Sequence, residues 1–418
     1  MYIHRELEKT ILPYLDRREA LSILGPRQAG KTTFLGEIVR VLEQAGKKVR
    51  FLTFENRADL DLFNTSIEDF KRLMAEYDVV VIDEFQYAKE GGQKLKYLYD
   101  TTTQKFIVSG SSSLDLVFQT GKYMVGRLLE FTLLPFSFRE FLSFREPELF
   151  SLLDKKENLT LLECDARDVF GEEITRRLSE LLEEFVLFGG YPAVTLTLER
   201  EEKEKILGGI AENYLLKDIE SLLHLATGDK LRVLEKLLST QIGNLVQYDE
   251  LSRASGLSFP ELKEHLNILE KTYVLTLVKP FFTNRRTELT KNPKVFFLDL
   301  GLRNFVLSDF RPLRDRPDAG ALMENYAYTL LSRRAPSLSM GVRYWRTKSK
   351  AEVDFVLETS DAVFPFEVKY SSKRVVGKSL HSFIRKFHPK RVAILTKDFA
   401  QQETISESMI NFLPLGYF

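Results

Sequence analysis

The eight residues from Gly25 to Thr32, GPRQAGKT, decide the fold of the N-terminal part of this chain. An apolar run with strand character, ALSIL, precedes them, and a helical pattern, TFLGEIVRVLEQAG, follows. The glycines let backbone N–H groups curl around a phosphate, and the start of the following helix adds its positive dipole end. The stretch therefore predicts a phosphate-binding loop between a strand and a helix of an α/β domain.

We expect this loop to bind ATP together with Mg²⁺. Lys31 would reach the β- and γ-phosphates, and the hydroxyl of Thr32 would bind Mg²⁺. The candidate nucleotide-binding residues are the loop itself, the residue after it and two residues from later in the chain: Gly25, Pro26, Arg27, Gln28, Ala29, Gly30, Lys31, Thr32, Thr33, Asp83 and Ser111.

A second signal is DVVVIDEFQYA, which begins at Asp78. Its apolar run is typical of a strand that is buried on both faces of a parallel sheet. Asp83 and Glu84 follow at the carboxyl end of that strand, where open α/β sheets bind their ligands. We expect Asp83 to hold Mg²⁺, usually through water, and Glu84 to polarise the attacking water, which favours a hydrolase. The alternative is an acidic turn after a strand.

Two more residues are candidates for the ATP site. Ser111, in the segment IVSGSSS, can sense the γ-phosphate, although a serine-rich turn explains it nearly as well. Arg127, in VGRLLEF, lies between the fourth strand and the next, which suits an arginine finger acting across a subunit boundary. A plain surface arginine is the competing interpretation. If Arg127 acts in trans, the protein is a homo-oligomer.

These blocks, with FTLLPFSFREF and FGGYPAV, resemble an AAA-type ATPase family found in archaea and bacteria, whose members carry a C-terminal domain of unknown function. The resemblance covers nearly the whole chain and implies ATP hydrolysis. We divide the chain into four predicted domains: an AAA-type P-loop ATPase core at 1–145, a helical lid at 146–230, a winged helix at 231–290 and an α/β domain at 291–418.

The winged helix is predicted from three helical patterns, an alternating apolar strand and the polar, basic tip TNRRTELTKNPK. The third helix would display a mixed set of side chains to DNA: Glu261, Lys263, Glu264, His265, Asn267 and Lys271. The tip offers better phosphate contacts: Arg285, Arg286, Lys291 and Lys294. A purely structural role between domains is the alternative.

The stretch FPFEVKY near the C-terminus places Glu367 and Lys369 on the same face of a strand. An earlier strand, EVDFVLE, carries Asp354, and an amphipathic helix over 319–335 carries Glu324. This order is similar to the core of restriction-endonuclease-like nucleases. We expect Asp354 and Glu367 to bind Mg²⁺ or Mn²⁺, with Glu324 as a further ligand. Lys369 would orient the attacking water or neutralise the scissile phosphate. An ion pair that fixes strand register is the alternative.

Charge is unevenly spread along a chain whose 60 basic and 60 acidic residues cancel. Residues 131–230 hold 21 acidic and 12 basic side chains, whereas residues 331–395 hold 14 basic and 5 acidic ones. The basic block favours a polyanion partner, with a solvated surface as the alternative. We expect it to hold the DNA backbone through six side chains: Arg346, Lys348, Lys350, Lys373, Arg374 and Lys378.

Other features limit the class of protein. No apolar run approaches ~18 residues and the N-terminus has no signal-peptide core, so we expect a cytoplasmic protein with no membrane span. The single cysteine, Cys164, excludes an internal disulfide. The favoured interpretation is an ATP-hydrolysing DNA-binding protein that couples an AAA-type ATPase to a metal-dependent nuclease-like domain in DNA processing or repair.

Two alternatives stay open. The first is a nucleotide-dependent regulator or scaffold whose nuclease-like domain is inactive and only binds DNA or protein. The second is a chaperone-like or toxin–antitoxin-like ATPase with no nucleic-acid role.

Overall fold

A computed structural model describes residues 2–111, 123–155, 170–212, 228–281, 291–334, 341–359 and 362–418. The chain divides into two compact units, Met1–Phe136 with Asn267–Val274, and Ser137–Leu266 with Leu275–Phe418. Within the described ranges, no helix combines the length and the apolar character that a membrane span requires.

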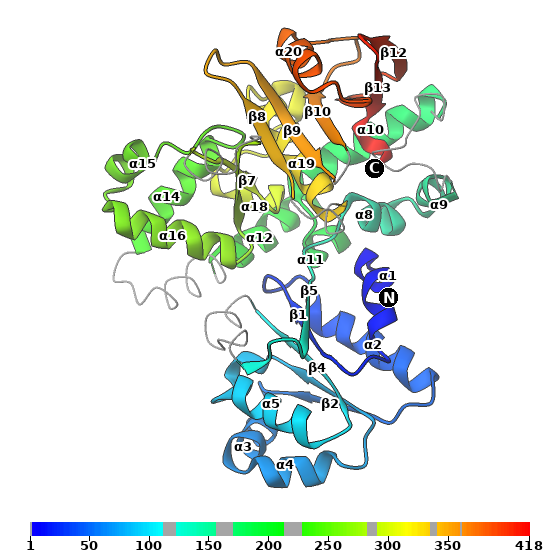
Figure 1. Ribbon diagram of the computed structural model, residues 1–418, viewed down its shortest axis with the longest axis vertical. Helices are drawn as coiled ribbons and strands as arrows, with labels where there is room; N and C mark the ends of the chain where they lie inside the picture. The colour runs from blue at the N-terminus through cyan, green and yellow to red at the C-terminus, as the bar shows by residue number, and fades with distance from the viewer. Residues whose placement is uncertain are drawn as a thin grey trace. The chain divides into compact units, whose positions relative to one another are not determined.

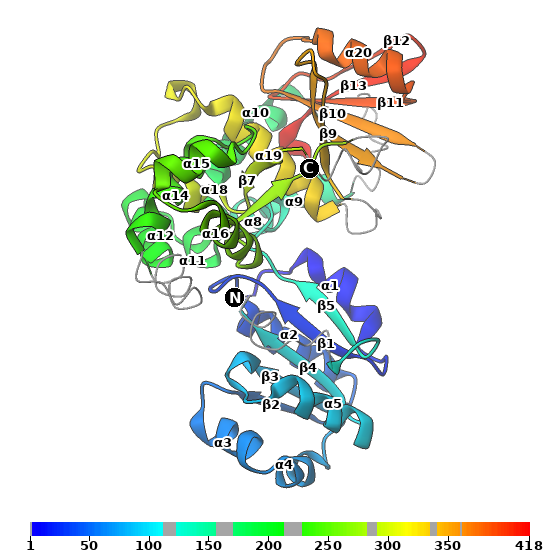
Figure 2. The ribbon, with the colours of Figure 1, turned by 60° about the vertical axis from the view of Figure 1, so that its left-hand side comes forward.

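The first unit is built on a sheet whose five described strands run in the order β2-β3-β4-β1-β5, with every neighbouring pair parallel (Figures 1 and 2). The strands are β1 (Ala20–Leu24), β2 (Val49–Thr53), β3 (Val79–Asp83), β4 (Lys105–Gly110) and β5 (Leu128–Thr132). The described helices are α1 (Glu6–Ile11), α2 (Lys31–Gln44), α3 (Arg57–Thr65), α4 (Ile67–Met74) and α5 (Gly91–Thr101), with short 3-10 turns η1 (Leu12–Tyr14) and η2 (Phe85–Tyr87).

Helices cover both faces of this sheet. On one face, α2 packs Phe34 and Ile38 against alternate residues of β1 and β3. On the other face, α3 and α4 pack Phe63 and Phe70 against the remaining residues of the same strands. Every residue of β3 is buried, which confirms the expected strand at Val79–Asp83 that is covered on both sides.

The second unit begins with a group of helices. The described helices before the C-terminal sheet are α8 (Phe138–Arg145), α9 (Pro147–Lys155), α10 (Glu172–Phe188), α11 (Pro192–Leu196), α12 (Arg200–Ile210), α14 (Gly228–Thr240), α15 (Tyr248–Ser255), α16 (Phe259–Lys271), α18 (Leu300–Val306), the 3-10 turn η4 (Leu313–Asp315) and α19 (Ala319–Arg334). The end of α16, from Asn267, belongs to the first unit. An antiparallel strand pair joins β6 (Leu275–Val278) and β7 (Lys294–Phe297).

The turn after α10 is fixed by one buried carboxylate. Asp299, which precedes α18, accepts hydrogen bonds from the backbone N–H of Gly190 at 2.8 Å and of Leu302 at 2.9 Å. Gly189 has a φ of +76°, and a Cβ built there would lie 2.2 Å from Asp299 Oδ1. Gly189 in FGGYPAV is therefore required by the close approach of Asp299, just before α18, to the end of α10.

The C-terminal part is a mixed sheet whose six described strands have the order β12-β13-β11-β10-β9-β8 (Figure 1). Its elements are β8 (Arg343–Arg346), β9 (Glu352–Glu358), β10 (Val363–Lys369), α20 (Lys378–Phe387), β11 (Arg391–Thr396), β12 (Gln401–Ile405), β13 (Ser408–Pro414) and the final 3-10 turn η5 (Leu415–Tyr417). Strands β8, β9 and β10 are antiparallel neighbours, whereas β10, β11 and β13 are parallel.

Two features of the structure bear on the organisation of the chain. The N-terminal segment of the first unit runs to Phe136, and α8 packs with the second unit. Its Phe138 and Phe141 pack against Phe185 of α10, which gives the reason. In addition, the antiparallel β12–β13 pair extends the C-terminal sheet beyond β11, and we did not predict this pair from the sequence.

Candidate functional site

The phosphate-binding loop follows the carboxyl end of β1, as predicted. Gly25 has a φ of +154°, and a Cβ there would meet the carbonyl oxygen of Leu133 at 2.1 Å. Gly30 caps α2 in the left-handed region with a φ of +91°. Only glycine fits the first position, because both the backbone conformation and the packing exclude a side chain.

Lys31 lies inside the loop. Its Nζ donates hydrogen bonds to the carbonyl oxygens of Gly25 at 3.0 Å and Pro26 at 2.9 Å. Burial lowers the pKa of Lys31 to about 8, although the carboxylates of Glu84 and Asp83 oppose that shift. The ammonium is thus held within the ring of backbone atoms that would surround a phosphate.

Asp83 gathers three donors at the end of β3. Thr32 Oγ1 donates to Asp83 Oδ2 at 2.6 Å, and the backbone N–H of Glu84 donates to Oδ1 at 3.0 Å. The hydroxyl of Ser109, which is fully buried at the end of β4, also donates to Asp83 Oδ1. The hydroxyl and the carboxylate that we expected to hold Mg²⁺ are therefore adjacent, and these residues fit that ion.

Two of the predicted residues lie beside this cluster. Glu84 adopts a left-handed conformation with a φ of +53°, and its carboxylate accepts a hydrogen bond from the side chain of Gln86. Ser111 is buried just beyond the end of β4. Ser109 rather than Ser111 contacts Asp83, and we did not single it out, because that contact depends on the pairing of β3 with β4.

Sequence reasoning also missed Arg5, which supports the loop from behind. Its Nη1 donates to the carbonyl oxygen of Ala29 at 3.0 Å, and its Nη2 donates to that of Leu134 at 2.5 Å. The guanidinium also lies over the ring of Phe136, 4.7 Å from the centroid. Arg5 joins the loop to the segment after β5, and no local motif marks it.

Arg127 lies at the amino ends of the strands, opposite the ends that carry the phosphate loop. Arg127 directly precedes Leu128, the first residue of β5, which pairs with Ala20, the first residue of β1. The phosphate loop follows the last residue of β1. The length of β1 separates the two by about 16 Å. Arg127 Nε lies 3.1 Å from Asp100 Oδ1. Arg127 therefore does not reach the phosphate loop of its own chain.

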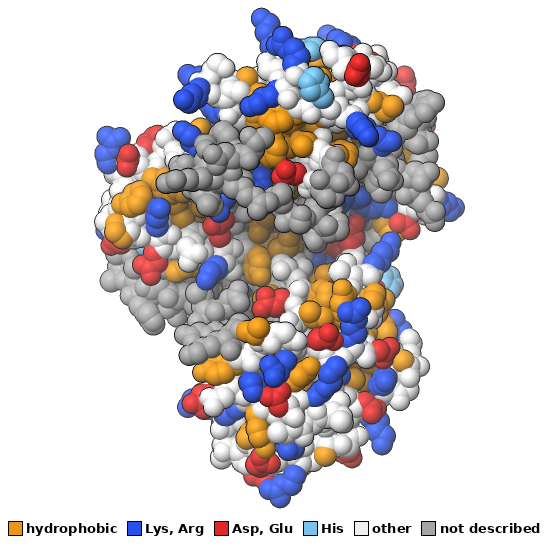
Figure 3. All heavy atoms as spheres, viewed as in Figure 1, with side chains coloured by type: hydrophobic (Ala, Val, Ile, Leu, Met, Phe, Trp, Pro, Cys, Tyr) orange, Lys and Arg blue, Asp and Glu red, His pale blue; other side chains and the backbone are white. Residues whose placement is uncertain are grey.

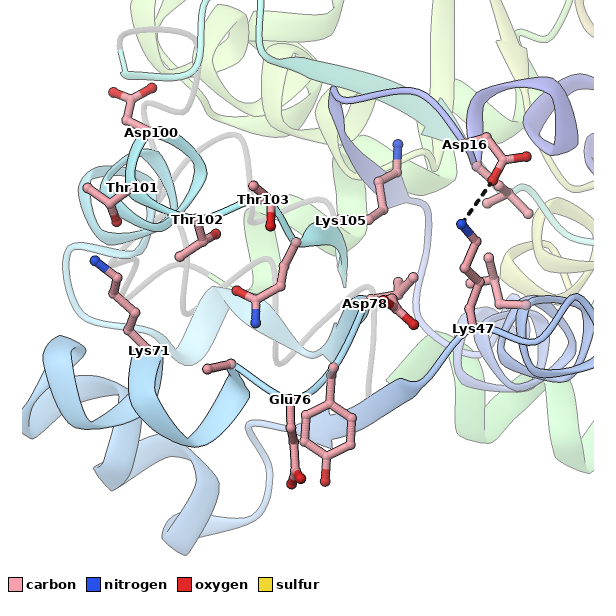
Figure 4. A pocket seen from close by; sticks show the side chains of 16 residues that line it. Asp16, Lys47, Lys71, Glu76, Asp78, Asp100, Thr101, Thr102, Thr103 and Lys105 are labelled. Carbon is pink, nitrogen blue, oxygen red and sulfur yellow. Dashed lines mark ion pairs between the residues drawn. The ribbon is translucent and has the colours of Figure 1, made fainter.

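A cleft of about 780 Å³ opens at the amino ends of the strands as well (Figure 4). Its walls come from the segments that enter β2, β3 and β4, and they mix acids such as Asp78 with bases such as Lys71. Asp16 and Lys47 form an ion pair of 3.7 Å across it. Because the phosphate loop lies at the opposite strand ends, this cleft is not the nucleotide site.

The second candidate site lies on the C-terminal sheet, where the three predicted residues come together. Lys369 Nζ lies 2.8 Å from Glu367 Oε1, so the E-x-K pair shares one face of β10. Phe366 pairs with Phe355 of β9, which places Glu367 beside Asp354. Asp354 Oδ2 accepts a hydrogen bond of 2.8 Å from the N–H of Val368.

Glu367 is buried, and one of its carboxylate oxygens has no hydrogen-bond partner among the described residues. It is 4% exposed, and its Oε2 accepts no hydrogen bond from any described residue. Burial, helped by the charge of Asp354, raises the pKa of Glu367 to about 7. Burial also raises the pKa of Asp354. A buried oxygen without a partner is costly, and a divalent cation between the two carboxylates would supply one.

Glu324 has a different partner from the one we expected. Lys294 Nζ lies 2.9 Å from Glu324 Oε1 and 2.5 Å from Glu352 Oε1. Burial raises the pKa of Glu324, and the charge of Lys294 opposes that shift. Burial lowers the pKa of Lys294, but the carboxylates of Glu324 and Asp354 outweigh it and leave that pKa raised.

The position of Lys294 corrects one expectation. We placed it on the exposed tip as a phosphate contact, but it is 1% exposed, because it is the first residue of β7 and points into this acidic group. Within the described part of the chain, no three His, Cys, Asp or Glu side chains are grouped to hold a metal ion. A cation here would have Asp354 and Glu367 as its protein ligands, completed by water, an arrangement that suits Mg²⁺.

The predicted DNA-facing residues have mixed positions. His265 is buried, with its Nδ1 2.7 Å from the carbonyl oxygen of Glu261, so it does not face outward from α16. Lys263 and Lys291 are exposed. Arg285 and Arg286 lie outside the described residues.

Comparison with known proteins supports the first site. Residues 17–142 match the family model of an AAA domain. Residues 179–312 and 319–418 match two models, each described as a domain of unknown function (DUF8612 and DUF4143). With the loop, Lys31, Thr32 and Asp83 in place, the first unit is an AAA-type P-loop ATPase domain.

Relatives share all three segments. An uncharacterized protein of Mycobacterium tuberculosis is 26% identical over 385 residues, which are 91% of this chain and 77% of the relative. One of Haemophilus influenzae is 24% identical over 395 residues, which are 91% of this chain and 90% of the relative.

Among solved structures, the replication initiator DnaA bound to AMPPCP and single-stranded DNA covers 65% of this chain and 90% of its own at 15% identity and a TM-score of 0.30. This likeness is too small to support an argument about the chain.

Proposed function

We propose that the protein is an ATP-hydrolysing, DNA-binding protein in which the AAA-type domain is coupled to a metal-dependent nuclease-like domain. For ATP hydrolysis, Lys31 would neutralise the β- and γ-phosphates, Thr32 and Asp83 would hold Mg²⁺, and Glu84 would orient the attacking water. The cluster of donors around Asp83 supports these roles.

The observation that carries the nuclease-like part is the meeting of Asp354, Glu367 and Lys369 on adjacent strands, where one Glu367 oxygen accepts no hydrogen bond from the described residues. The element order α19, β8, β9, β10, α20, β11 supports a restriction-endonuclease-like core. A divalent cation held by Asp354 and Glu367 would supply an activated water at a phosphodiester. Lys369, 32% exposed at its side chain, would stabilise negative charge on the scissile phosphate.

The order of α14, α15, α16 and the β6–β7 pair supports a winged helix, which would add DNA contacts through exposed side chains such as Lys263. A homo-oligomer is proposed from the position of Arg127, which is too far from the loop of its own chain to reach the ATP bound there.

A second candidate function is a nucleotide-dependent regulator whose nuclease-like domain binds DNA without cutting it. The position of Lys294 favours this regulator. The Lys294 ammonium lies beside the carboxylates of Glu324 and Glu352 and neutralises them, as a metal ion would in an active nuclease site.

Cleavage of labelled linear, single-stranded and four-way-junction DNA tests the proposal, with Mg²⁺ or Mn²⁺ and with or without ATP. Asp354→Asn and Lys369→Ala should both abolish cleavage, whereas Glu358→Gln, on the same strand as Asp354, should not. If the wild type cuts no substrate while it still hydrolyses ATP, the regulator takes the place of the nuclease.

A further inference from the structure

A groove of about 570 Å³ runs along the edge strand β8. The described residues that line it include four cations, Lys291, Arg346, Lys348 and Lys386, and no acidic residue. Lys291, Lys348 and Lys386 are exposed. In Figure 3, Lys and Arg side chains are scattered over the face in view, and several lie at the end of the second unit formed by α20. The groove differs from the rest of this surface because its cations surround one cavity that has no acidic residue among its described lining residues.

The floor of the groove is buried and held by hydrogen bonds and ring packing. Tyr344 and Trp345 of β8 are almost fully buried there. The hydroxyl of Tyr344 donates to the carbonyl oxygen of Asn292 at 2.6 Å, and its backbone N–H donates to that of Lys279 at 3.2 Å. Trp345 packs edge-on against the ring of Phe383, with centroids 5.2 Å apart. The lysine side chains therefore project from a fixed surface, which limits the ordering cost of binding.

The groove leads to the carboxylate site. Arg346 pairs with Glu352 of β9, and its Nη1 donates to Glu352 Oε2 at 2.9 Å. Asp354 lies two residues farther along β9, on the same face and about 7 Å away. A strand that contacts the cations of the groove would thus continue toward Asp354.

We propose that this groove binds the sugar–phosphate backbone of a DNA strand and directs it to the Asp354–Glu367–Lys369 site. The inference rests on the proposed DNA-binding function. Its recognition is by charge, since the exposed lysines would contact phosphates and read no base. Binding should therefore be independent of sequence and strongly dependent on salt.

The test uses the full chain and fluorescein-labelled duplex DNA, with affinity measured by anisotropy over a range of salt concentrations. A groove variant combines Lys291→Gln, Lys348→Gln and Lys386→Gln. A matched control combines Lys155→Gln, Lys205→Gln and Lys390→Gln, which remove the same charge from exposed lysines of the same unit that do not line the groove. Fluorescence of Trp345, the only tryptophan, checks that the groove floor stays folded.

We expect the slope of log affinity against log salt to fall by up to about 2.7 in the groove variant, or about 0.9 for each lost phosphate contact. The control should keep the wild-type slope. Equal slopes in both variants would overturn the groove and leave the proposed function standing. Absence of any DNA binding by the wild type would overturn the DNA-binding function and the groove together.

Discussion

Lys294 Nζ and Glu324 Oε1 lie 2.9 Å apart, and this ion pair joins β7 to α19 in a region where both side chains are largely buried. Glu352 shares the same ammonium. The pair also lies next to Asp354, so it both stabilises the second unit and sets the charge around the candidate metal ligands.

Replacing Lys294 by Met should lower the free energy of unfolding by about 3–5 kcal/mol, because it leaves two carboxylates without their cation. Adding Glu324→Gln should restore part of that loss. Urea unfolding followed by Trp345 fluorescence measures both, with Lys390→Met as an exposed control. A loss no larger than that of the control would show that the ion pair contributes little to stability.

Glu84→Gln should keep nucleotide binding but reduce the rate of ATP hydrolysis by about 10²–10⁴-fold, because the amide cannot orient water as a carboxylate does. Lys31→Ala should lose binding as well. Titration with a fluorescent ATP analogue and a phosphate-release assay separate the two effects. Glu90→Gln, at a nearby exposed residue, is the control, and equal rates for Glu84→Gln and Glu90→Gln would remove Glu84 from the mechanism.

Arg127→Ala should reduce ATP hydrolysis by about 10³-fold or more without weakening nucleotide binding, if the guanidinium completes the site of a neighbouring subunit. Mixing this variant with Lys31→Ala protein should restore part of the activity, since the second protein still supplies Arg127. Asp100→Asn, which removes the carboxylate that Arg127 shares with Lys96, should keep most of the activity. Failure of the mixture to recover any activity would contradict action in trans.

Asp299 should make the second unit less stable as the pH rises. Burial raises its pKa from 3.8 to about 6, so the folded state keeps a proton that the unfolded chain has lost between these values. Stability is therefore highest below about pH 4 for this group and falls by about 3 kcal/mol by pH 7.

The variant Asp299→Asn lacks this titration, so its stability relative to the wild type should improve by that amount over the same range. Denaturant unfolding followed by Trp345 fluorescence measures the difference. Asp309→Asn is a suitable control, because a hydrogen bond from Arg311 lowers the pKa of Asp309 from 3.8 to about 2, so its contribution to stability rises with pH and is nearly constant above about pH 5. A difference that does not change with pH would contradict the prediction for Asp299.

Both candidate sites could be predicted where the signal is local. The phosphate loop needs glycine at fixed positions, and β3 is a short apolar run that ends in Asp83, so adjacent residues reveal each of them. The E-x-K pair is equally local, because strand alternation alone places Glu367 and Lys369 on one face.

Contacts between distant segments could not be predicted in this way. Ser109 reaches Asp83 through the register of two strands, and Arg5 reaches Ala29 from the segment just before α1. Lys294 belongs to a segment that reads as a polar tip, KNPK, and only its packing between β9 and α19 shows that it is buried. The β12–β13 hairpin turns through Ser406 and Glu407, both at positive φ, where an Asn-Gly pair would have marked the turn.

The ion pair of Lys294 with Glu324 also has an evolutionary consequence. Lys294 lies in the segment that matches one domain of unknown function, and Glu324 lies in the segment that matches the other. Recombination that exchanged one segment alone would leave an uncompensated charge in the protein interior. We therefore expect the two segments to be inherited together as a pair.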